Sequence, residues 1–366
     1  MKFKALQQDL LPAISAVARS VGIRSTLPIL DNLLLSAQNK KLKIAGTNLE
    51  IGVIKFLTVD VLEEGETTVP AKTLVDLVSN IGQTTIEIES QNNITSLQSG
   101  KLKAQINGIA PEEFPVIPTS KENGVSFSKE VIQSSSGILF AAAVDEGRPV
   151  LTGILTEVKD NALDMVATDG FRLAHRHLKL PAGIKQFKSL IPKRTYEEVV
   201  RIISEEEVDQ VSIAASDDQN QVIFNLGQTL VSSRLIEGNF PSWEKIIPKE
   251  TISRMLIDKE DFLKALKLAA IFARNEANVL VLNVREKSLV LESSTRELGS
   301  QENEIDAQVE GDEVKIAFNS KFLHDAISNA PATQLMVEFS GPLSPALIKP
   351  VGVEGLEYIV MPVRLS

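Results

Sequence analysis

The sequence LDMVATDGFRLAHRH, residues 163–177, reads as two short strands joined by a tight turn. An apolar run that begins at Leu163 ends at Thr168-Asp169-Gly170, and the alternation of apolar residues resumes at Phe171 and Leu173. An Asp-Gly pair between alternating runs is a strong hairpin signal, because glycine accepts a positive φ and Asp can bond its own backbone. The segment therefore predicts a β-hairpin.

This hairpin pattern recurs along the chain. The sequence LKIAGTNL at 42–49 has the same apolar spacing and a Thr-Asn turn, and LVLESSTR at 289–296 repeats the pattern more weakly. The three copies begin at Leu42, Leu163 and Leu289, at intervals of 121 and 126 residues, close to a third of the 366-residue chain. The chain is therefore predicted to contain three copies of one domain.

Each predicted copy contains two helices and about eight strands. Apolar residues at helical spacing predict the first helix of each copy at 7–21, 129–143 and 259–273, and the second at 71–81, 193–203 and 319–329. The first strand after the opening helix is expected at 29–37. Phe-Pro segments at Phe114 and Phe240 indicate linkers, which gives domains at 1–120, 121–248 and 249–366.

The order of these elements predicts the fold class. Strands come in runs and do not alternate with helices, so each copy should be α+β, an antiparallel sheet with both helices packed on one side. Pairing of edge strands between neighbouring domains would hide the exposed edges. Three domains joined in this way form an arc, and an arc with complementary ends closes by dimerising.

Composition limits the class of protein. A hydrophobic content of 43% with 23% charged residues is ordinary for a folded protein. No apolar run suits a membrane span and the N-terminus lacks a signal-peptide pattern, so we expect a cytoplasmic protein with no membrane partner. The absence of cysteine agrees with that address. A net charge of −10 argues against a protein that simply coats nucleic acid.

No catalytic constellation stands out in the sequence. His175-x-His177 could place two imidazoles on one strand face, as in a metal site, but we interpret them as ordinary strand residues because a structural zinc has four ligands and no cysteine is available. Asp169 could act as a general acid or base, yet beside Gly170 it is better explained as a turn residue. We predict no metal, no cofactor and no catalytic residue.

Charge is distributed unevenly between the predicted helices and the rest of the chain. The six helices, with Arg274 directly after the helix at 259–273 included, carry eleven Lys and Arg against eight Asp and Glu. The small excess alone favours an ordinary solvated face. Its direction also fits helices that face a polyanion, because local charge decides the interaction at a screening length of about 8 Å.

The residues around the central hairpin and the chain end could form either part of a core or an apolar groove for an extended peptide. From composition alone, ordinary core packing is the simpler interpretation. The residues in question are Leu151, Thr168, Gly170, Arg172, Leu173, Pro241, Ile246, Val360, Met361 and Pro362.

Four stretches together resemble the bacterial DNA polymerase III β subunits, the replicative sliding clamps. They are TLPILDNLLL at 26–35, ATDGFRLA at 167–174, LIEGNFP at 235–241 and MPVRL at 361–365. The resemblance spans the whole chain. It implies a non-catalytic processivity factor: a head-to-tail homodimer that forms a ring around double-stranded DNA, without sequence specificity, with helices lining the hole.

The resemblance also implies sites and partners. The replicative DNA polymerase, the clamp loader and repair proteins would insert short peptide motifs into a pocket formed by Leu151, Thr168, Gly170, Phe171, Arg172, Leu173, Pro241, Ile246, Phe322, Ile359, Val360, Met361, Pro362, Val363 and Arg364. Arg24, Arg148, Lys193 and Arg194 match positions that face DNA or lie near it, and Ile271 and Phe272 match apolar positions between subunits.

Some residues depart from the family pattern. Phe171 replaces a frequent His, Val150 stands where an aromatic residue can occur, Lys245 replaces an Arg, and Ser366 extends past the usual terminal Leu. Two alternatives remain open from the sequence: a scaffold that binds partners near residue 360 without encircling DNA, and an enzyme that uses carboxylates in a cleft between domains.

Overall fold

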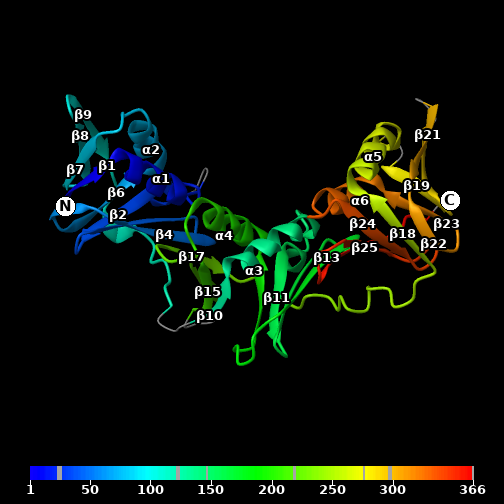
Figure 1. The fold of residues 1–366 in the computed structure, drawn as a ribbon. Coiled ribbons are helices and arrows are strands. Elements are labelled where there is room, and N and C mark those ends of the chain that lie inside the picture. Colours follow the sequence, from blue (N-terminus) through cyan, green and yellow to red (C-terminus); the bar gives the residue numbers. More distant parts are fainter. Residues whose placement is uncertain are drawn as a thin grey trace. The chain divides into compact units, whose positions relative to one another are not determined.

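The structure is a computed structural model that describes residues 1–22, 27–120, 124–145, 147–216, 220–274, 277–295 and 299–364. The chain forms two compact units, the first from residues 1–132 and 198–235 and the second from residues 133–197 and 236–366. Figure 1 labels their helices and strands. Within the described residues, no helix is long and apolar enough to cross a membrane.

The first unit contains two antiparallel sheets. The smaller has the strand order β5-β1-β7-β8-β9, in which the strands are Asp60–Glu63, Lys2–Leu6, Thr85–Gln91, Ile94–Ser99 and Leu102–Asn107. The larger has the order β10-β15-β16-β17-β4-β3-β2-β6, with strands Val125–Ser128, Gln210–Ala215, Gln221–Asn225, Thr229–Arg234, Ile51–Thr58, Lys41–Thr47, Asn32–Gln38 and Gly65–Pro70.

The second unit also contains two antiparallel sheets. The larger has the order β14-β11-β12-β13-β26-β25-β24-β18-β22, with strands Phe187–Pro192, Gly153–Lys159, Ala162–Thr168, Arg172–Lys179, Leu356–Val360, Ala346–Pro350, Gln334–Phe339, Ser253–Asp258 and Gln308–Gly311. The smaller has the order β21-β20-β19-β23, with strands Gly299–Asp306, Ser288–Thr295, Val279–Arg285 and Val314–Asn319.

Strand order confirms the threefold repeat. The series β6-β2-β3-β4, β14-β11-β12-β13 and β23-β19-β20-β21 have the same internal order, and so do β1-β7-β8-β9, β10-β15-β16-β17 and β18-β24-β25-β26. Each copy therefore contributes two four-stranded half-sheets. In two places, half-sheets of successive copies join edge to edge, through β4 with β17 and through β13 with β26.

The predicted hairpins are confirmed in the first and second copies. Strands β12 and β13 pair from Ala162 opposite Lys179 to Thr168 opposite Leu173, and β3 pairs with β4 in the equivalent register. In the third copy β20 pairs with β21, and the turn between them lies outside the described residues.

Six α-helices occur in the described chain: α1 Gln7–Ala18, α2 Ala71–Ser79, α3 Lys129–Gln133, α4 Lys193–Glu205, α5 Lys259–Ala273 and α6 Ser320–Ser328. Helix α1 packs against α2 and against β3 and β4, while α5 packs against α6 and against β20 and β21. Asp258 caps α5 by accepting hydrogen bonds from the backbone N–H groups of Glu260 and Asp261, as expected for an N-cap carboxylate.

The predicted helix at 129–143 was wrong in length. Helix α3 ends at Gln133 and is followed by 3₁₀ turns at Ser134–Gly137 and Leu139–Ala141. The sequence Ser134-Ser135-Ser136-Gly137 explains the change, because serine side chains compete for backbone hydrogen bonds and glycine is costly in an α-helix.

The predicted strand at 29–37 begins later than expected. Residues Pro28–Asp31 form a 3₁₀ turn, and β2 begins at Asn32. The fixed φ of Pro28 suits the start of such a turn, which the Leu30 N–H closes by donating to the Leu27 carbonyl.

Candidate functional site

The turn between β12 and β13 is held by its own side chains. Thr168 Oγ1 accepts a hydrogen bond from the Gly170 N–H at 3.0 Å, and Asp169 Oδ1 accepts from the N–H groups of Phe171 and Arg172 at 2.9 and 3.0 Å. Gly170 has φ +91°, a conformation that residues with a Cβ rarely adopt. The turn therefore presents Phe171 and Arg172 in a fixed direction.

Arg172 connects this turn to α6. Its Nε donates to Asp169 Oδ2 at 3.0 Å, and its Nη1 donates to Asp325 Oδ2. The guanidinium also lies over the rings of Phe140 and Phe322, at 5.4 and 4.9 Å from their centroids. With a side chain only 12% exposed, Arg172 has a single well-defined position.

The end of the chain lies against the same turn. The Met361 N–H donates to the Phe171 carbonyl at 2.9 Å, and the Val363 N–H donates to the Ala317 carbonyl at 2.8 Å. The ring of Phe171 stacks on Phe322 at 5.8 Å between centroids. Phe171 is 56% exposed and Met361 is 37% exposed, so two large apolar side chains border the site in solvent.

A cluster of buried apolar residues forms the floor beside these exposed side chains. Its members are Leu155, Val166, Leu173, Leu190, Leu347 and Ile359, and the partly buried residues packed against it are Val150, Ile236, Phe240, Trp243, Ile246 and Ile247. Five of the six partly buried residues come from 236–247, so the linker that follows the second copy lies on this floor.

The structure brings most of the predicted pocket residues into this region. Leu173, Ile359 and Ile246 share the apolar cluster, and Phe171, Arg172, Phe322 and Met361 are joined by the contacts above. The remaining ones differ in burial: Leu151, Thr168 and Val360 are buried, Pro362 and Val363 are partly buried, and Pro241 and Arg364 are exposed.

Sequence reasoning missed several residues that build the site. Asp325 and Phe140 hold Arg172, and Leu155, Leu347 and Trp243 complete the floor. The alternation of apolar residues in 153–159 and 346–350 could have indicated the two leucines. Asp325 and Phe140 gave no comparable signal, because their contacts join residues far apart in sequence.

A polar cluster of Asp164, His175, His177 and Glu357 lies on the same sheet face as Leu173, beginning two residues further along β13. His175 Nε2 and His177 Nδ1 both lie 2.8 Å from Asp164 Oδ1, and His175 Nδ1 lies 2.9 Å from Glu357 Oε1. The ring of Trp243 packs on His175 at 4.3 Å between centroids. Burial alone would lower the pKa of His175, but its hydrogen bonds to Asp164 and Glu357 outweigh burial and raise that pKa.

The first unit carries the equivalent join of two copies, and there the floor is closed. The buried residues Ile29, Leu30, Ala45, Ile54 and Phe114 form its cluster, with Leu34, Phe56, Ile109, Ile117 and Leu230 packed against it. A Cβ placed on Gly52 would lie 2.7 Å from Ile117 Cγ2. Ile117 therefore fills the space above Gly52, which stands 121 residues before Leu173.

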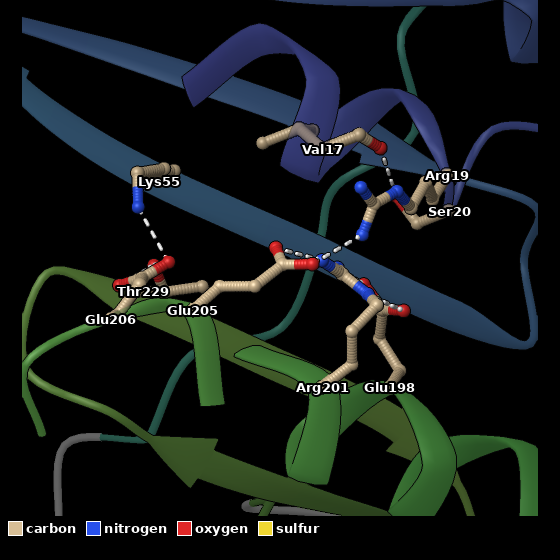
Figure 2. A network of polar contacts seen from close by, with 9 residues as sticks. All are labelled: Val17, Arg19, Ser20, Lys55, Glu198, Arg201, Glu205, Glu206 and Thr229. Carbon is tan, nitrogen blue, oxygen red and sulfur yellow. Dashed lines mark hydrogen bonds and ion pairs between the residues drawn. The ribbon is translucent and has the colours of Figure 1, made fainter. Parts of the chain in front are cut away.

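Figure 2 shows a polar network in the first unit that joins α1 and β4 to the second copy. Arg19 directly follows α1, and Glu205 is the last residue of α4. Arg19 Nη1 lies 3.0 Å from Glu205 Oε1. Arg201 pairs with Glu205 and with Glu198 on the same helix. Two helix cations are therefore neutralised by helix carboxylates.

The network continues at β4. Lys55 Nζ pairs with Glu206 Oε1, and Thr229 Oγ1 lies 3.0 Å from both carboxylate oxygens of Glu206 (Figure 2). The Lys55 and Glu206 side chains are 13% and 17% exposed, so this pair is better shielded than the pair of Arg19 with Glu205, whose side chains are each 47% exposed.

The residues predicted to face DNA are placed as follows. Arg148 is exposed, and its Nη1 would lie 3.1 Å from a Cβ on Gly170. Lys193 and Arg194 lie in the first turn of α4, where Lys193 Nζ is 3.7 Å from Glu197 Oε1 and Arg194 is exposed. Arg24 lies outside the described residues.

The residues predicted to lie between subunits belong to α5. Ile271 is 52% exposed, Phe272 is partly buried, and the helix that carries them packs against β21. Strands β21 and β9 each lie at one of the two edges of their sheets. An apolar helix face beside an open sheet edge is typical of an interface with another chain.

Three family descriptions together match almost the whole chain: the N-terminal domain of the DNA polymerase III beta subunit at residues 1–118, the central domain at 126–242 and the C-terminal domain at 244–364. The beta sliding clamp of Synechococcus elongatus is 30% identical over 374 residues, with all of both chains covered.

Solved structures are similar over their full length. The DNA polymerase sliding clamp of Bacillus subtilis has a TM-score of 0.94 at 28% identity, with all of both chains covered. The beta sliding clamp of C. crescentus, crystallised with polyethylene glycol bound to the region proposed for beta-motif tethering, has a TM-score of 0.92 at 26% identity and covers 100% of this chain and 99% of its own. The chain therefore belongs to the family of DNA polymerase III beta subunits, the beta sliding clamps, which are non-catalytic processivity factors of the replicative polymerase.

Proposed function

We propose that two copies of this chain close into a ring around double-stranded DNA and that partners dock through the site at the central hairpin. The observation that carries the ring is the pair of open edges. Each internal join pairs the last strand of one half-sheet with the last strand of another, β4 with β17 and β13 with β26. By the same rule, β21 would pair with β9 of a second copy.

The charges on the two edges support this pairing. Strand β21 carries Glu302, Glu304 and Asp306, whereas β9 carries Lys103 and follows Lys101. Opposite charges on facing strands favour pairing, and like charges oppose it. The exposed side chains of Ile271 on α5 and Leu102 on β9 add apolar surface beside these edges.

A charge swap tests the ring. The double variant Lys101→Glu with Lys103→Glu makes the β9 edge acidic like β21. The double variant Glu302→Lys with Glu304→Lys makes the β21 edge basic like β9. We expect each double variant alone to raise the dimer Kd at least tenfold, by sedimentation, and an equimolar mixture to restore the dimer, because every β21 then meets a β9 of opposite charge. Unchanged dimerisation in both variants would contradict the proposed edge.

Enclosure explains how an acidic protein can serve DNA. Among the helix cations of the described chain, Arg19, Lys193, Arg201 and Lys264 pair with carboxylates of neighbouring residues. The remaining attraction to phosphates would be weak and independent of sequence, which suits sliding. Arg148, Lys193 and Arg194, together with Arg24 at a position without described structure, are proposed to contribute to it.

Retention on circular DNA tests enclosure separately. The protein is loaded onto nicked circular DNA by a clamp loader, and the DNA is then cut once. We expect the protein to stay on the circle and to leave the linear form. Persistent binding to linear DNA with free ends would contradict a sliding ring, and it would leave the edge pairing unaffected.

We propose the region around Phe171, Leu173, Phe322, Ile359 and Met361 as the docking site for short peptide motifs of the polymerase, the clamp loader and repair proteins. A buried apolar floor with exposed apolar side chains beside it suits an extended apolar peptide. Arg172 would not anchor the ligand by its charge, since Asp169 and Asp325 already accept from it.

Truncation of one side chain in each half of the molecule tests the docking site. Met361→Ala should weaken the binding of a labelled peptide from the polymerase about tenfold, because it removes an exposed apolar side chain from a residue whose backbone is bonded to Phe171. Leu49→Ala is the control: Leu49 lies in the equivalent turn of the first copy, 121 residues before Gly170, and its 48% exposure exceeds the 37% of Met361. Equal affinity of wild type and Met361→Ala, by fluorescence anisotropy, would contradict the site.

The predicted domain boundaries and the cytoplasmic location stay predictions. We propose breaks near residues 120 and 248, in the two Phe-Pro segments, because each copy then keeps both of its half-sheets. Limited proteolysis that cuts first within β3 or β12 would contradict these boundaries.

A further inference from the structure

Three side chains of the second unit converge on one point of the sheet. Asp164 lies on β12, directly opposite His177 on β13, and His175 is two residues before His177 on the same face. Their ligand atoms, one from each residue, all lie within 4.8 Å of one another. The chain has only three histidines, and two of them meet at this carboxylate.

We propose that Asp164, His175 and His177 bind a divalent metal ion of the zinc, nickel and copper group. Two imidazole nitrogens and one carboxylate oxygen are a ligand set that these ions prefer, and no cysteine is needed. Typical bonds of about 2.0–2.2 Å would place the ligand atoms about 3.3 Å apart. The two nitrogens therefore need to move about half an ångström from Asp164 Oδ1, which lies 2.8 Å from each, and all three ligand atoms already lie within 4.8 Å of one another. A water molecule would complete the coordination.

Glu357 supplies the second feature of a metal site. His175 Nε2 points toward Asp164, and its other ring nitrogen lies 2.9 Å from Glu357 Oε1 on the neighbouring strand β26. Histidines that bind metals usually donate their second N–H to a carboxylate or a carbonyl, which fixes the ring. Here the contact that would fix the ring is already present in the protein alone.

The site is reachable from solvent. The side chain of His177 is 43% exposed and that of Asp164 is 24% exposed, whereas His175 is 9% exposed. An ion can therefore enter past His177, and His175 forms the inner wall. Trp243 packs on His175, so the single tryptophan of the chain lies beside the proposed ion.

The first copy shows that the fold does not require this cluster. At the positions 121 residues earlier stand Lys43, Ile54 and Phe56, in the same register, with Lys43 opposite Phe56. Ile54 and Phe56 belong to the apolar cluster of that unit. A packed apolar surface was therefore sufficient at the equivalent join, and the two histidines and two carboxylates of the second unit need another explanation.

The test uses the full chain after dialysis against EDTA. Zn²⁺ is titrated by calorimetry, and Co²⁺ is followed by its visible absorption and by quenching of Trp243. We expect one site per chain, a higher Tm with Zn²⁺, and saturable quenching with Co²⁺. His177→Phe, which installs the residue of the first copy, should fold and should weaken binding at least tenfold.

Two further variants sharpen the result. Glu357→Gln should weaken Zn²⁺ binding about ten- to a hundredfold, because only the orientation of His175 is lost. His324→Gln removes the remaining histidine and should leave the titration unchanged. Absence of saturable binding at about millimolar Zn²⁺ would show a purely hydrogen-bonded cluster, and binding that survives in His177→Phe would place the ion elsewhere; either result overturns the proposal.

Discussion

The two joins between successive copies use one plan with opposite distributions of polar groups. On the sheet face, the first join has Ile54 and Phe56 where the second has His175 and His177. After its first helix, the first join has the ion pair of Arg19 with Glu205. The residue 121 positions after Arg19 is Phe140, which packs edge-on against Tyr358 of β26 at 5.2 Å between ring centroids.

The joins also differ in how the linker covers the floor. Phe114 of the first linker is buried and Ile117 seats on Gly52, while Phe240 and Ile246 of the second linker stay partly exposed and Leu173 replaces the glycine. The same backbone thus gives a closed core at one join and an open apolar surface at the other. The difference teaches that side chains, not topology, restrict the proposed docking site to the second join.

Replacing the phenylalanine of each linker should give the largest difference between the joins. Phe114→Ala removes a side chain that is 8% exposed and should lower the free energy of unfolding by about 3 kcal/mol or more. Phe240→Ala should cost less, because its ring already meets solvent. Trp243 fluorescence follows unfolding of the second unit, and circular dichroism follows both units. Phe114→Ala should therefore shift the transition seen by circular dichroism and leave the fluorescence transition unchanged. Equal costs would contradict the distinction between a closed and an open floor.

Filling the space above Gly52 should have the next largest effect. In Gly52→Ala, the new methyl would meet Ile117 Cγ2 at 2.7 Å and Ser232 Oγ at 2.8 Å, so we expect destabilisation by about 1–3 kcal/mol in urea unfolding. The effect should shrink in the background of Ile117→Ala, which removes one of the two colliding side chains. Gly82→Ala is the control, since a Cβ there meets nothing within 4 Å. If both glycine variants behave alike, Ile117 does not close the first join.

Exchanging one turn residue should have a smaller effect. Asn48 Oδ1 accepts from the N–H groups of Glu50 and Ile51, as Asp169 Oδ1 accepts from those of the equivalent residues. Asp169→Asn should therefore keep the turn and lose only the ion pair to Arg172, at a cost of about 1 kcal/mol in unfolding. The reverse change, Asn48→Asp, should be nearly neutral because Ile51 offers no cation. A large loss in both variants would mean that the amide and the carboxylate do not support the same turn.

The fold could be predicted from the sequence further than the site could. The hairpin at 163–177 and its spacing gave the repeats and the antiparallel sheets, because turn chemistry and alternation are local. The polar cluster around His175 could not be predicted in detail, since Asp164 and Glu357 reach it from separate strands, 11 and 182 residues away. The 129–143 helix failed because local hydroxyl groups outweighed apolar periodicity, and the closure of the first join by Ile117 left no signal in composition.

The ion pair of Arg19 with Glu205 at the first join should give the smallest and most conditional effect. Partial burial alone would raise the pKa of Glu205, but its pairs with Arg19 and Arg201 outweigh burial and lower that pKa. A lowered carboxyl pKa stabilises the folded chain at pH values above the unfolded pKa near 4.5, and this stabilisation disappears as the pH falls through the folded pKa.

Arg19→Gln should therefore lower the urea midpoint slightly at pH 6, and the midpoints of the variant and the wild type should converge as the pH approaches 3. High salt should also remove the difference, because both side chains are half exposed and screened. A gap that persists in acid or in salt would mean that Arg19 acts through packing of its stem and not through its charge, and the polar link across the first join would then depend on the contacts of Glu206 with Lys55 and Thr229.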